Sequence, residues 1–317
     1  MTEAAKGFWA MVLACVVWGL SSLYYKALAH VPPLEVLSHR TLWSLVFFGA
    51  VLALQGRLGA LGEALRGRGV LVLVFSALMI SANWFVFIWS VQNGHAMQAS
   101  LGYYIFPLVA VLIGVLGFGE RLGRVQQAAV ALAVLAVVVL TLGLGAAPWI
   151  ALVLAVTFGL YGMVKKRLAV GPVVSVTAEV ALLAPLAAIW LAGVHEGWWS
   201  EAGGAALPPF GGWFGHDART SAMLAFSGVL TGGPLMLFSF AARRVRMATV
   251  GLVQYLNPTL QFLCATLAFG EPFTPWHRAA FGLIWAALAL YSWAAFRQPK
   301  AVASVASSAS TSATGIR

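Results

Sequence analysis

Long apolar segments, separated by short polar or Gly/Pro-rich breaks, make up most of this chain. Each segment approaches the ~20 apolar residues that a helix needs to cross ~30 Å of bilayer hydrocarbon. Because most connecting segments are very short, consecutive helices should be antiparallel neighbours. The pattern predicts ten membrane-spanning helices, at residues 8–29, 33–55, 70–91, 96–118, 125–143, 148–166, 172–193, 220–241, 247–269 and 275–296.

The composition supports a chain embedded in lipid. Hydrophobic residues make up 61% of it, charged residues make up 9%, and the mean hydropathy is +0.90. So few charged side chains cannot cover a water-facing surface, which predicts an all-α membrane protein. Cys15 and Cys264 lie inside apolar segments and indicate neither a disulfide framework nor a metal site. The first apolar segment has no small-residue cleavage site after it and is interpreted as a retained helix.

Lysine and arginine gather in alternate connecting segments. If the N-terminus is cytoplasmic, the outside segments carry only Arg219 and Arg278. By the positive-inside rule this asymmetry predicts a multi-pass membrane protein with both termini cytoplasmic. It also argues against a nucleic-acid partner despite the net charge of +10, because the basic clusters are short helix flanks. The inside segments would hold Lys6, Arg57, Arg66, Arg68, Arg121, Arg124, Lys165, Lys166, Arg167, Arg243, Arg244, Arg246, Arg297, Lys300 and Arg317.

Two segments lie outside the helix pattern. The long outer segment 194–219 is acidic and rich in tryptophan, a residue that suits the headgroup level of a bilayer. The sequence leaves open whether this segment is a lid or an interfacial loop. Residues 299–317 are rich in Ala, Ser and Thr and are predicted to form a disordered cytoplasmic tail.

The chain repeats itself. At a constant offset of 151 residues, Tyr104 aligns with Tyr255, Pro107 aligns with Pro258, and the Phe-Gly-Glu at 118–120 aligns with the one at 269–271. At an offset of 140 residues, WGLSSLYYKALA at 18–29 aligns with FGLYGMVKKRLA at 158–169. These matches predict two five-helix units, at 1–146 and 147–298. Since five is odd, the second unit must enter the membrane from the opposite side.

An inverted repeat is typical of secondary transporters, in which one half rocks against the other around a site near the midplane. Polar groups within a membrane helix belong where they line such a cavity, and proline is tolerated there. This interpretation accounts for Gln254, Tyr255 and Asn257 at one end of the ninth helix. Pro107 and Pro258 are expected to kink their helices, either beside the cavity or for packing alone.

Several motifs carry a family resemblance. Trp-Gly or Phe-Gly in the first helix of each unit, with Gly-Glu closing the fourth, resembles the EamA domain of the drug/metabolite transporter superfamily. The chain resembles the RarD subgroup of this family more closely, over roughly residues 8–296. The resemblance rests on LSHRTLWS at 37–44, NWFVFIWSVQN at 83–93, ASLGYYIFPL at 99–108, FGER at 118–121 and QYLNPT at 254–259.

The resemblance implies a ten-helix inner-membrane permease with both termini cytoplasmic. Members of the subgroup have been linked to chloramphenicol sensitivity or resistance. One position departs from the subgroup pattern. The subgroup usually has Asn directly before the proline of the first unit, whereas this chain has Phe106 there. Asn257 occupies the paired position in the second unit, so a polar contact could have changed sides and the substrate could differ.

Charged residues inside a membrane are costly unless they are paired or wetted, so they are the first functional candidates. Arg40 lies ~10 Å into the second helix, beside His39. Glu179 lies at a comparable depth in the seventh helix and aligns with His39 at the offset of 140. Arg40 is expected either to attract anionic or carbonyl groups or to act as a structural tether. Glu179 is expected either to pair with a cation or to carry a coupled proton.

Other polar and aromatic side chains complete the candidate site. Glu120 and Glu271 close the fourth helix of each unit and are expected to cap a neighbouring helix N-terminus. Asn83 and Gln254 could bind substrate or join helices, and the sequence leaves both roles open. Rings with a polar group suit amphipathic organic ligands. The aromatic candidates are Trp18, Trp84, Tyr103, Tyr104, Tyr161 and Tyr255.

The leading hypothesis is a secondary transporter that exports small amphipathic metabolites or drugs, with proton coupling as an open addition. No ATP-binding loop motif occurs, and neither a cofactor nor a metal is expected. A membrane-embedded lipid-modifying enzyme is one alternative, although the six histidines show no catalytic spacing. A passive channel or structural subunit is another. The sequence predicts no oligomeric state.

Overall fold

The architecture is taken from a computed structural model, which describes all residues except 68, 119–121, 169, 199–210, 246 and 298–317. Throughout those described ranges the regular structure is helical, which confirms the all-α class. Seven helices there are long and apolar enough to cross a membrane, and Trp149–Lys165 is a shorter apolar helix. The molecule is therefore a multi-pass membrane protein.

Each of the ten predicted ranges contains helical structure, but the match is not one to one. The ninth range, 247–269, is divided into α10, α11 and the π-helix η1, so the prediction of one continuous helix there is wrong. The short helix α3 was not predicted. The elements are α1 (Glu3–Ala27), α2 (Pro33–Leu54), α3 (Leu58–Arg66), α4 (Val70–Gln92), α5 (Ala96–Phe118), α6 (Arg124–Leu144), α7 (Trp149–Arg167), α8 (Pro172–His195), α9 (Ala218–Ala242), α10 (Met247–Gln254), α11 (Leu256–Leu263), η1 (Cys264–Ala268) and α12 (Pro275–Arg297).

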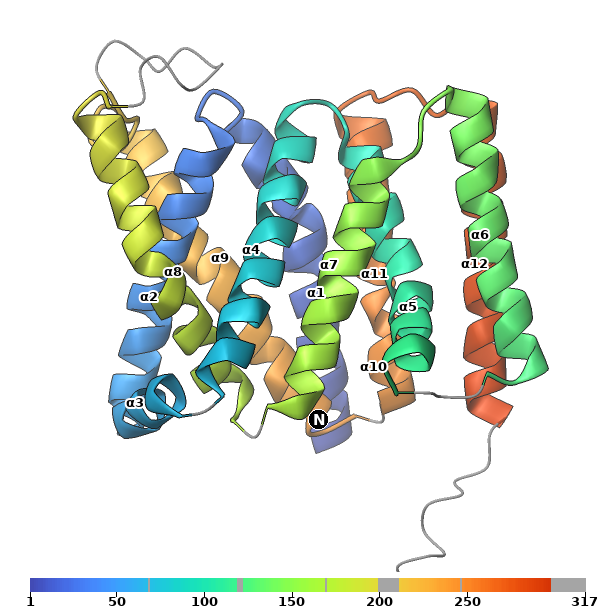
Figure 1. Ribbon diagram of the computed structural model, residues 1–317, viewed down its shortest axis with the longest axis horizontal. Helices are drawn as coiled ribbons and strands as arrows, with labels where there is room; N and C mark the ends of the chain where they lie inside the picture. Colours follow the sequence, from blue (N-terminus) through green and yellow to red (C-terminus); the bar gives the residue numbers. More distant parts are fainter. Residues whose placement is uncertain (68, 119–121, 169, 199–210, 246, 298–317) are drawn as a thin grey trace, which may run out of the picture.

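Consecutive long helices run in opposite directions through a single bundle (Figure 1). Helix α1 begins and α12 ends at the lower end of the view, whereas α7 begins at the upper end. Helices α6 and α12 pack against each other at one edge of the bundle. Elsewhere α1 packs on α9 and α11, while α7 packs on α4 and α5. The first helix of each half thus contacts two helices of the other half, and these are equivalent at the offset of 151 residues: α4 to α9, and α5 to the range of α10 and α11.

The break in the ninth range follows from Pro258. Proline has no backbone N–H and its ring crowds the preceding turn, so a helix usually stops before it. Helix α10 ends at Gln254, and α11 begins at Leu256. Two hydroxyls donate to backbone carbonyls around the break: Thr259 Oγ1 to Tyr255 O at 2.6 Å, and Ser100 Oγ to Pro258 O at 2.8 Å. Pro107, by contrast, lies inside α5, which stays one helix.

The predicted capping role of Glu271 is confirmed. Gly270 has φ +66°, a left-handed conformation that glycine adopts easily and that ends the preceding helix. The following carboxylate accepts hydrogen bonds from the N–H groups of Ala96 at 2.7 Å and Met97 at 2.8 Å. These are the first two N–H groups of α5, which have no partner inside the helix. Glu120, the equivalent residue of the first half, lies outside the described residues.

The glycines of the Trp-Gly and Phe-Gly motifs allow two helix crossings. A Cβ added to Gly19 in α1 would lie 2.6 Å from Leu260 Cβ in α11. A Cβ added to Gly159 in α7 would lie 2.8 Å from Ile113 Cδ1 and 3.6 Å from Val109 Cγ1 in α5. Gly19 aligns with Gly159 at the offset of 140, and Val109 aligns with Leu260 at the offset of 151. Equivalent residues therefore make equivalent contacts in the two halves.

We predict that Gly19→Ala destabilises the protein whereas Gly162→Ala does not. The added methyl group at Gly19 meets α11, and overpacking of this kind typically costs ~1–3 kcal/mol. Nothing lies within 4 Å of the corresponding position at Gly162 in α7, where alanine favours the helix by up to ~1 kcal/mol. Unfolding of the two variants in detergent measures the difference. Equal effects would contradict the proposed close crossing of α1 and α11.

Candidate functional site

Arg40 lies where four helices meet. Its side chain leaves α2, and the residue is 7% exposed. Its Nε donates a hydrogen bond to Thr231 Oγ1 of α9 at 2.9 Å. The guanidinium carbon lies 4.0 Å from the ring centroid of Trp84 in α4 and 5.7 Å from that of Tyr25 in α1. Both distances suit cation–π attraction, which strengthens as water is excluded.

The charge of Arg40 has no carboxylate partner within the described part of the chain. The ion pairs found there join Glu3 to Lys6 and Arg244, and Glu179 to Lys165. Thr231 is held in place because its hydroxyl donates to Ser227 O at 2.9 Å. A hydroxyl and aromatic ring faces therefore surround a buried cation.

Glu179 of α8 is the second buried charge, and its residue is 1% exposed. Its Oε1 lies 2.6 Å from Lys165 Nζ and accepts a hydrogen bond from Ser76 Oγ at 2.6 Å. Its Oε2 accepts a hydrogen bond from the Tyr161 hydroxyl at 3.3 Å. Lys165 Nζ also donates to Ser175 Oγ at 2.6 Å and lies 5.0 Å from the Tyr161 ring centroid. Glu179 thus pairs with a cation, one of the two roles expected for it.

Aromatic rings connect the surroundings of the two charges. Tyr25 contacts Phe87 with ring centroids 5.8 Å apart, and Phe87 contacts Tyr103 at 5.8 Å. Tyr103 then contacts Phe158 at 5.9 Å, and Phe158 stacks on Tyr161 at 6.0 Å. The chain of rings therefore runs from the neighbour of Arg40 to the neighbour of Glu179.

The position that departs from the RarD pattern belongs to this aromatic chain. Phe106 of α5 packs edge-on against Phe158 of α7, with ring centroids 4.8 Å apart. Asn257, at the paired position of the second half, accepts a hydrogen bond from Gln261 Nε2 at 3.0 Å. The substitution therefore adds an apolar ring to the interior of the first half.

Asn83 joins helices and has little capacity left for a ligand. Its Nδ2 donates to Leu154 O and to Thr157 Oγ1, both at 3.0 Å. Its Oδ1 accepts a hydrogen bond from the Tyr103 hydroxyl at 2.8 Å. These contacts tie α4 to α7 and α5. Of the two roles left open for Asn83, the geometry favours helix-to-helix contact.

The two buried charges each make a hydrogen bond from one half of the chain to the other. Arg40 joins α2 to α9 through Thr231, and Glu179 joins α8 to α4 through Ser76. At the repeat offsets α2 is equivalent to α8 and α9 is equivalent to α4, so the two bonds lie at equivalent interfaces. The sequence brings Glu179 into register with His39 rather than with Arg40.

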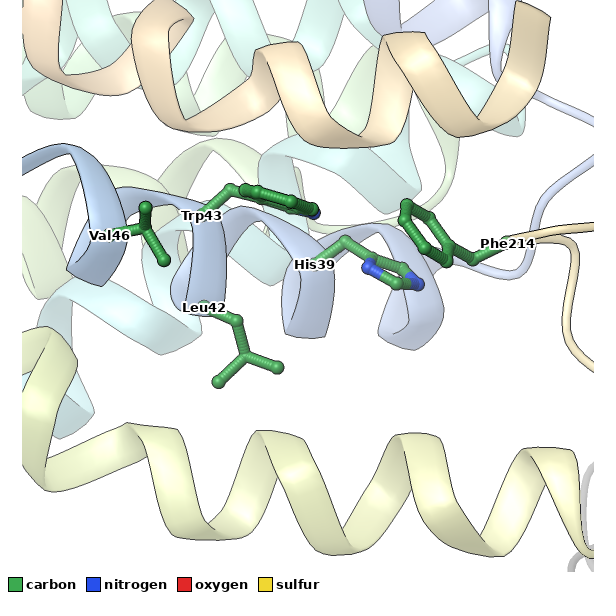
Figure 2. A pocket seen from close by; sticks show the side chains of 5 residues that line it. All are labelled: His39, Leu42, Trp43, Val46 and Phe214. Atoms are coloured by element: carbon green, nitrogen blue, oxygen red, sulfur yellow. The ribbon is translucent and has the colours of Figure 1, made fainter. Parts of the chain in front are cut away.

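His39 faces away from the Arg40 contacts. Its ring stacks on Phe214, with ring centroids 4.7 Å apart. Figure 2 shows the two side chains beside each other. The two side chains line an apolar groove of about 240 Å³ together with Leu42, Trp43 and Val46. His39 is therefore a residue of this groove and not of the cluster around Arg40.

The remaining candidates are dispersed along other helix contacts. Tyr104 of α5 is hydrogen-bonded to Thr259 Oγ1 of α11 at 2.6 Å. Trp18 of α1 packs against Phe238 of α9 with ring centroids 6.0 Å apart. The others lie on or beside the broken ninth segment: Gln254, Tyr255, Asn257 and Pro258. Pro107 lies in α5, three residues after Tyr104.

Sequence reasoning missed four residues that hold the charges or the outer loop. It treated Lys165 only as a cytoplasmic flank, and it assigned no role to Thr231 or Ser76. The sequence signal that could have pointed to Thr231 and Ser76 was a hydroxyl side chain within an otherwise apolar helix. Sequence reasoning also assigned no role to Glu35. Glu35 is 1% exposed and its Oε1 accepts a hydrogen bond from Trp213 N at 2.6 Å, which ties the described end of the outer loop to α2.

The same end of the loop is held by two further contacts. Trp213 packs edge-on against His30, with ring centroids 4.7 Å apart. Asp217 caps α9, because its carboxylate accepts hydrogen bonds from Thr220 N at 2.7 Å and from Arg219 N at 3.3 Å. The hydrogen bonds from Thr220 hold the pKa of Asp217 below its usual range.

Within the described ranges, no three His, Cys, Asp or Glu side chains lie close enough to hold a metal ion. The site therefore consists of two buried charges, their hydroxyl partners and a path of aromatic rings. Rings beside buried polar groups suit the binding of an amphipathic organic molecule.

Comparison with known proteins gives the family. The model of the EamA-like transporter family matches residues 5–142 and again residues 146–293. The chain belongs to the EamA-like transporter family. It is 41% identical to the protein RarD of Streptomyces exfoliatus, over 89% of this chain and 86% of that protein. It is 34% identical to the protein RarD of Escherichia coli, over 91% and 94% of the two chains. These similarities assign it to the RarD subgroup of EamA transporters.

The chain is also similar to a further transporter and to a solved structure. An uncharacterized transporter of Pseudomonas aeruginosa is 40% identical over 92% of this chain and 95% of that protein. A solved crystal structure superposes with a TM-score of 0.59 at 19% identity, over 92% of this chain and 98% of the other. At that identity the superposition shows a shared fold alone. The family match and the named relatives make this protein a membrane transporter.

We predict that Lys165→Met destabilises the protein far more than the double variant Lys165→Met with Glu179→Gln. Removal of one partner leaves a buried carboxylate uncompensated, at a cost of ~3 kcal/mol or more. An uncharged amide at position 179 needs no counter-charge and can still bond to Ser76 and Tyr161. Thermal unfolding of both variants in detergent measures the recovery. If the double variant is no more stable than the single one, Lys165 does not neutralise Glu179.

Proposed function

We propose that this protein is a secondary transporter that exports small amphipathic metabolites or drugs across the bacterial inner membrane by alternating access. The observation that carries this proposal is the pair of buried charges, Arg40 and Glu179, each bonded to the opposite half at an equivalent interface. An ionised group within a membrane helix usually marks a transport path, because it is too costly to keep without a role.

An arrangement of ten spans in two inverted five-helix halves is part of the proposal. Its support comes from the opposite starting ends of α1 and α7 and from the two family matches, one in each half. The equivalent crossings at Gly19 and Gly159 support it further. Both termini of the chain would then be cytoplasmic, as the Lys and Arg distribution predicts.

The two hydrogen bonds between the halves would each hold one side of the transporter closed. Opening of the outer side requires α2 to leave α9, which breaks the bond between Arg40 and Thr231. Opening of the cytoplasmic side requires α8 to leave α4, which breaks the bond between Glu179 and Ser76. A binding site near the midplane, reached alternately from each side, needs two such interfaces.

Proton coupling through Glu179 is the second part of the proposal. A proton on this carboxylate would remove its charge and with it the attraction to Lys165, which lies 2.6 Å away. The Ser76 and Tyr161 hydroxyls would also lose an ionised acceptor. One protonation event would thus loosen the contacts between α8 and both α7 and α4.

The rival functions make different predictions. A lipid-modifying enzyme would convert its substrate chemically, and a channel would equilibrate a solute without accumulating it. One relative, of Pseudomonas aeruginosa, is named chloramphenicol-sensitive protein RarD and is 30% identical over 92% of this chain. That name makes chloramphenicol a reasonable member of a substrate panel for this chain.

We predict that proteoliposomes containing this protein accumulate at least one compound of a metabolite and drug panel against its gradient. Arg40→Ala should reduce accumulation at least tenfold, which corresponds to ~1.4 kcal/mol. Glu179→Gln should abolish the response to an imposed pH gradient. Arg244→Gln, which alters a partly exposed residue paired with Glu3, serves as the matched control and should behave like the wild type.

The outcomes separate the parts of the proposal. Chemical turnover of a lipid would favour the enzyme, and equilibration without accumulation would favour the channel. Full dependence on the pH gradient in Glu179→Gln would remove the coupling role from that residue.

A further inference from the structure

We infer that the ligand of the Arg40 site is a monocarboxylate with an apolar body. This inference rests on the proposed function, because it names the class of molecule that the transporter would carry. It depends on three observations: the lack of a described carboxylate beside Arg40, the free edge of the guanidinium group and the rings around it.

Among the described residues, Arg40 has no carboxylate beside it to neutralise its charge. Glu179 and Lys165 neutralise each other at 2.6 Å. Arg40 is nine-tenths buried, and none of the described carboxylates pairs with it. Glu35, in the same helix, instead accepts a hydrogen bond from Trp213 N. A buried cation without a counter-charge is unfavourable, and a ligand that supplies the charge removes that cost.

The hydrogen bonds of Arg40 leave one edge of the group for a carboxylate. A guanidinium group has five N–H donors in a plane. Within the described residues, Nε is the one nitrogen of Arg40 with a hydrogen bond, and its acceptor is Thr231. The two terminal nitrogens therefore keep their donors, and together they match the two oxygens of a carboxylate. Trp84 covers one face of the group at 4.0 Å, so the ligand must approach in the plane.

The surroundings distinguish a carboxylate from other ligands. A phosphate monoester carries up to two negative charges near neutral pH, and the described residues bring no second cation to Arg40. Lys26 lies elsewhere, with its Nζ 5.7 Å from the ring centroid of Phe269. A primary amine would be repelled. The neighbouring rings of Tyr25, Trp84 and Phe87 suit an apolar or aromatic body, and Asn83 has already used its amide on other helices.

Thermal unfolding of the full-length protein in detergent tests the inference without any transport step. The probes are hexanoate and 3-phenylpropanoate, the methyl ester of each, and 3-phenylpropylamine. We expect both acids to raise the melting temperature of the wild type, and we expect the esters and the amine not to raise it. Arg40→Gln should lose the response to the acids. Arg40→Lys, which keeps the charge but not the planar pair of donors, should bind them at least tenfold more weakly.

The stability of the unliganded variant separates binding from a structural tether. If Arg40 serves a ligand, Arg40→Gln without ligand should melt at or above the temperature of the wild type, because an uncompensated charge has been removed. A fall of several degrees would show that Arg40 is a tether and would overturn the inference. So would an equal shift from acids and esters, a shift retained in Arg40→Gln, or no shift from either acid.

Failure of this inference is distinguishable from failure of the proposed function. If proteoliposomes accumulate a neutral or cationic compound and no acid binds, the transporter proposal stands and the substrate class is wrong. If the acids bind through Arg40 and nothing accumulates, the ligand class stands and the transport proposal fails.

Discussion

The cost of keeping an ionised side chain away from water constrains the interior of this protein more than any other interaction. In lipid the charge must be paired, hydrogen-bonded or brought to the interface. Glu179 meets that requirement with Lys165 and two hydroxyls. Within the described ranges, Arg40 meets it with Thr231 and ring faces. The positions of α1, α4, α7 and α9 around the two charges follow from these needs.

The helix positions could be predicted from the sequence because a membrane span leaves a long, uninterrupted apolar signal. Two details could not. Helix α3 is a short helix of nine residues, too short for a span to be recognised. The break before Pro258 was expected only as a kink, because the same residue type at Pro107 leaves α5 continuous. Which proline interrupts its helix depends on partners such as Ser100, and these come from the packing.

Arg40 and Glu179 could also be predicted, since so few charges occur inside the apolar segments. Their partners could not, because Thr231 lies 191 residues from Arg40 and Ser76 lies 103 residues from Glu179. The direction of a side chain was a second source of error. His39 neighbours Arg40 in the sequence, but consecutive residues of a helix point about 100° apart, and His39 faces Phe214.

The absence of a counter-charge beside Arg40 among the described residues has an electrical consequence. A charge that shifts within the bilayer exchanges energy with the membrane potential, at ~2.3 kcal/mol per elementary charge and 100 mV for a full crossing. A negative cell interior therefore draws the empty protein toward whichever state holds Arg40 nearer the cytoplasm. A bound anion would cancel that pull. In the transport cycle proposed above, the voltage would therefore act on the empty carrier and not on the carrier that holds an anion.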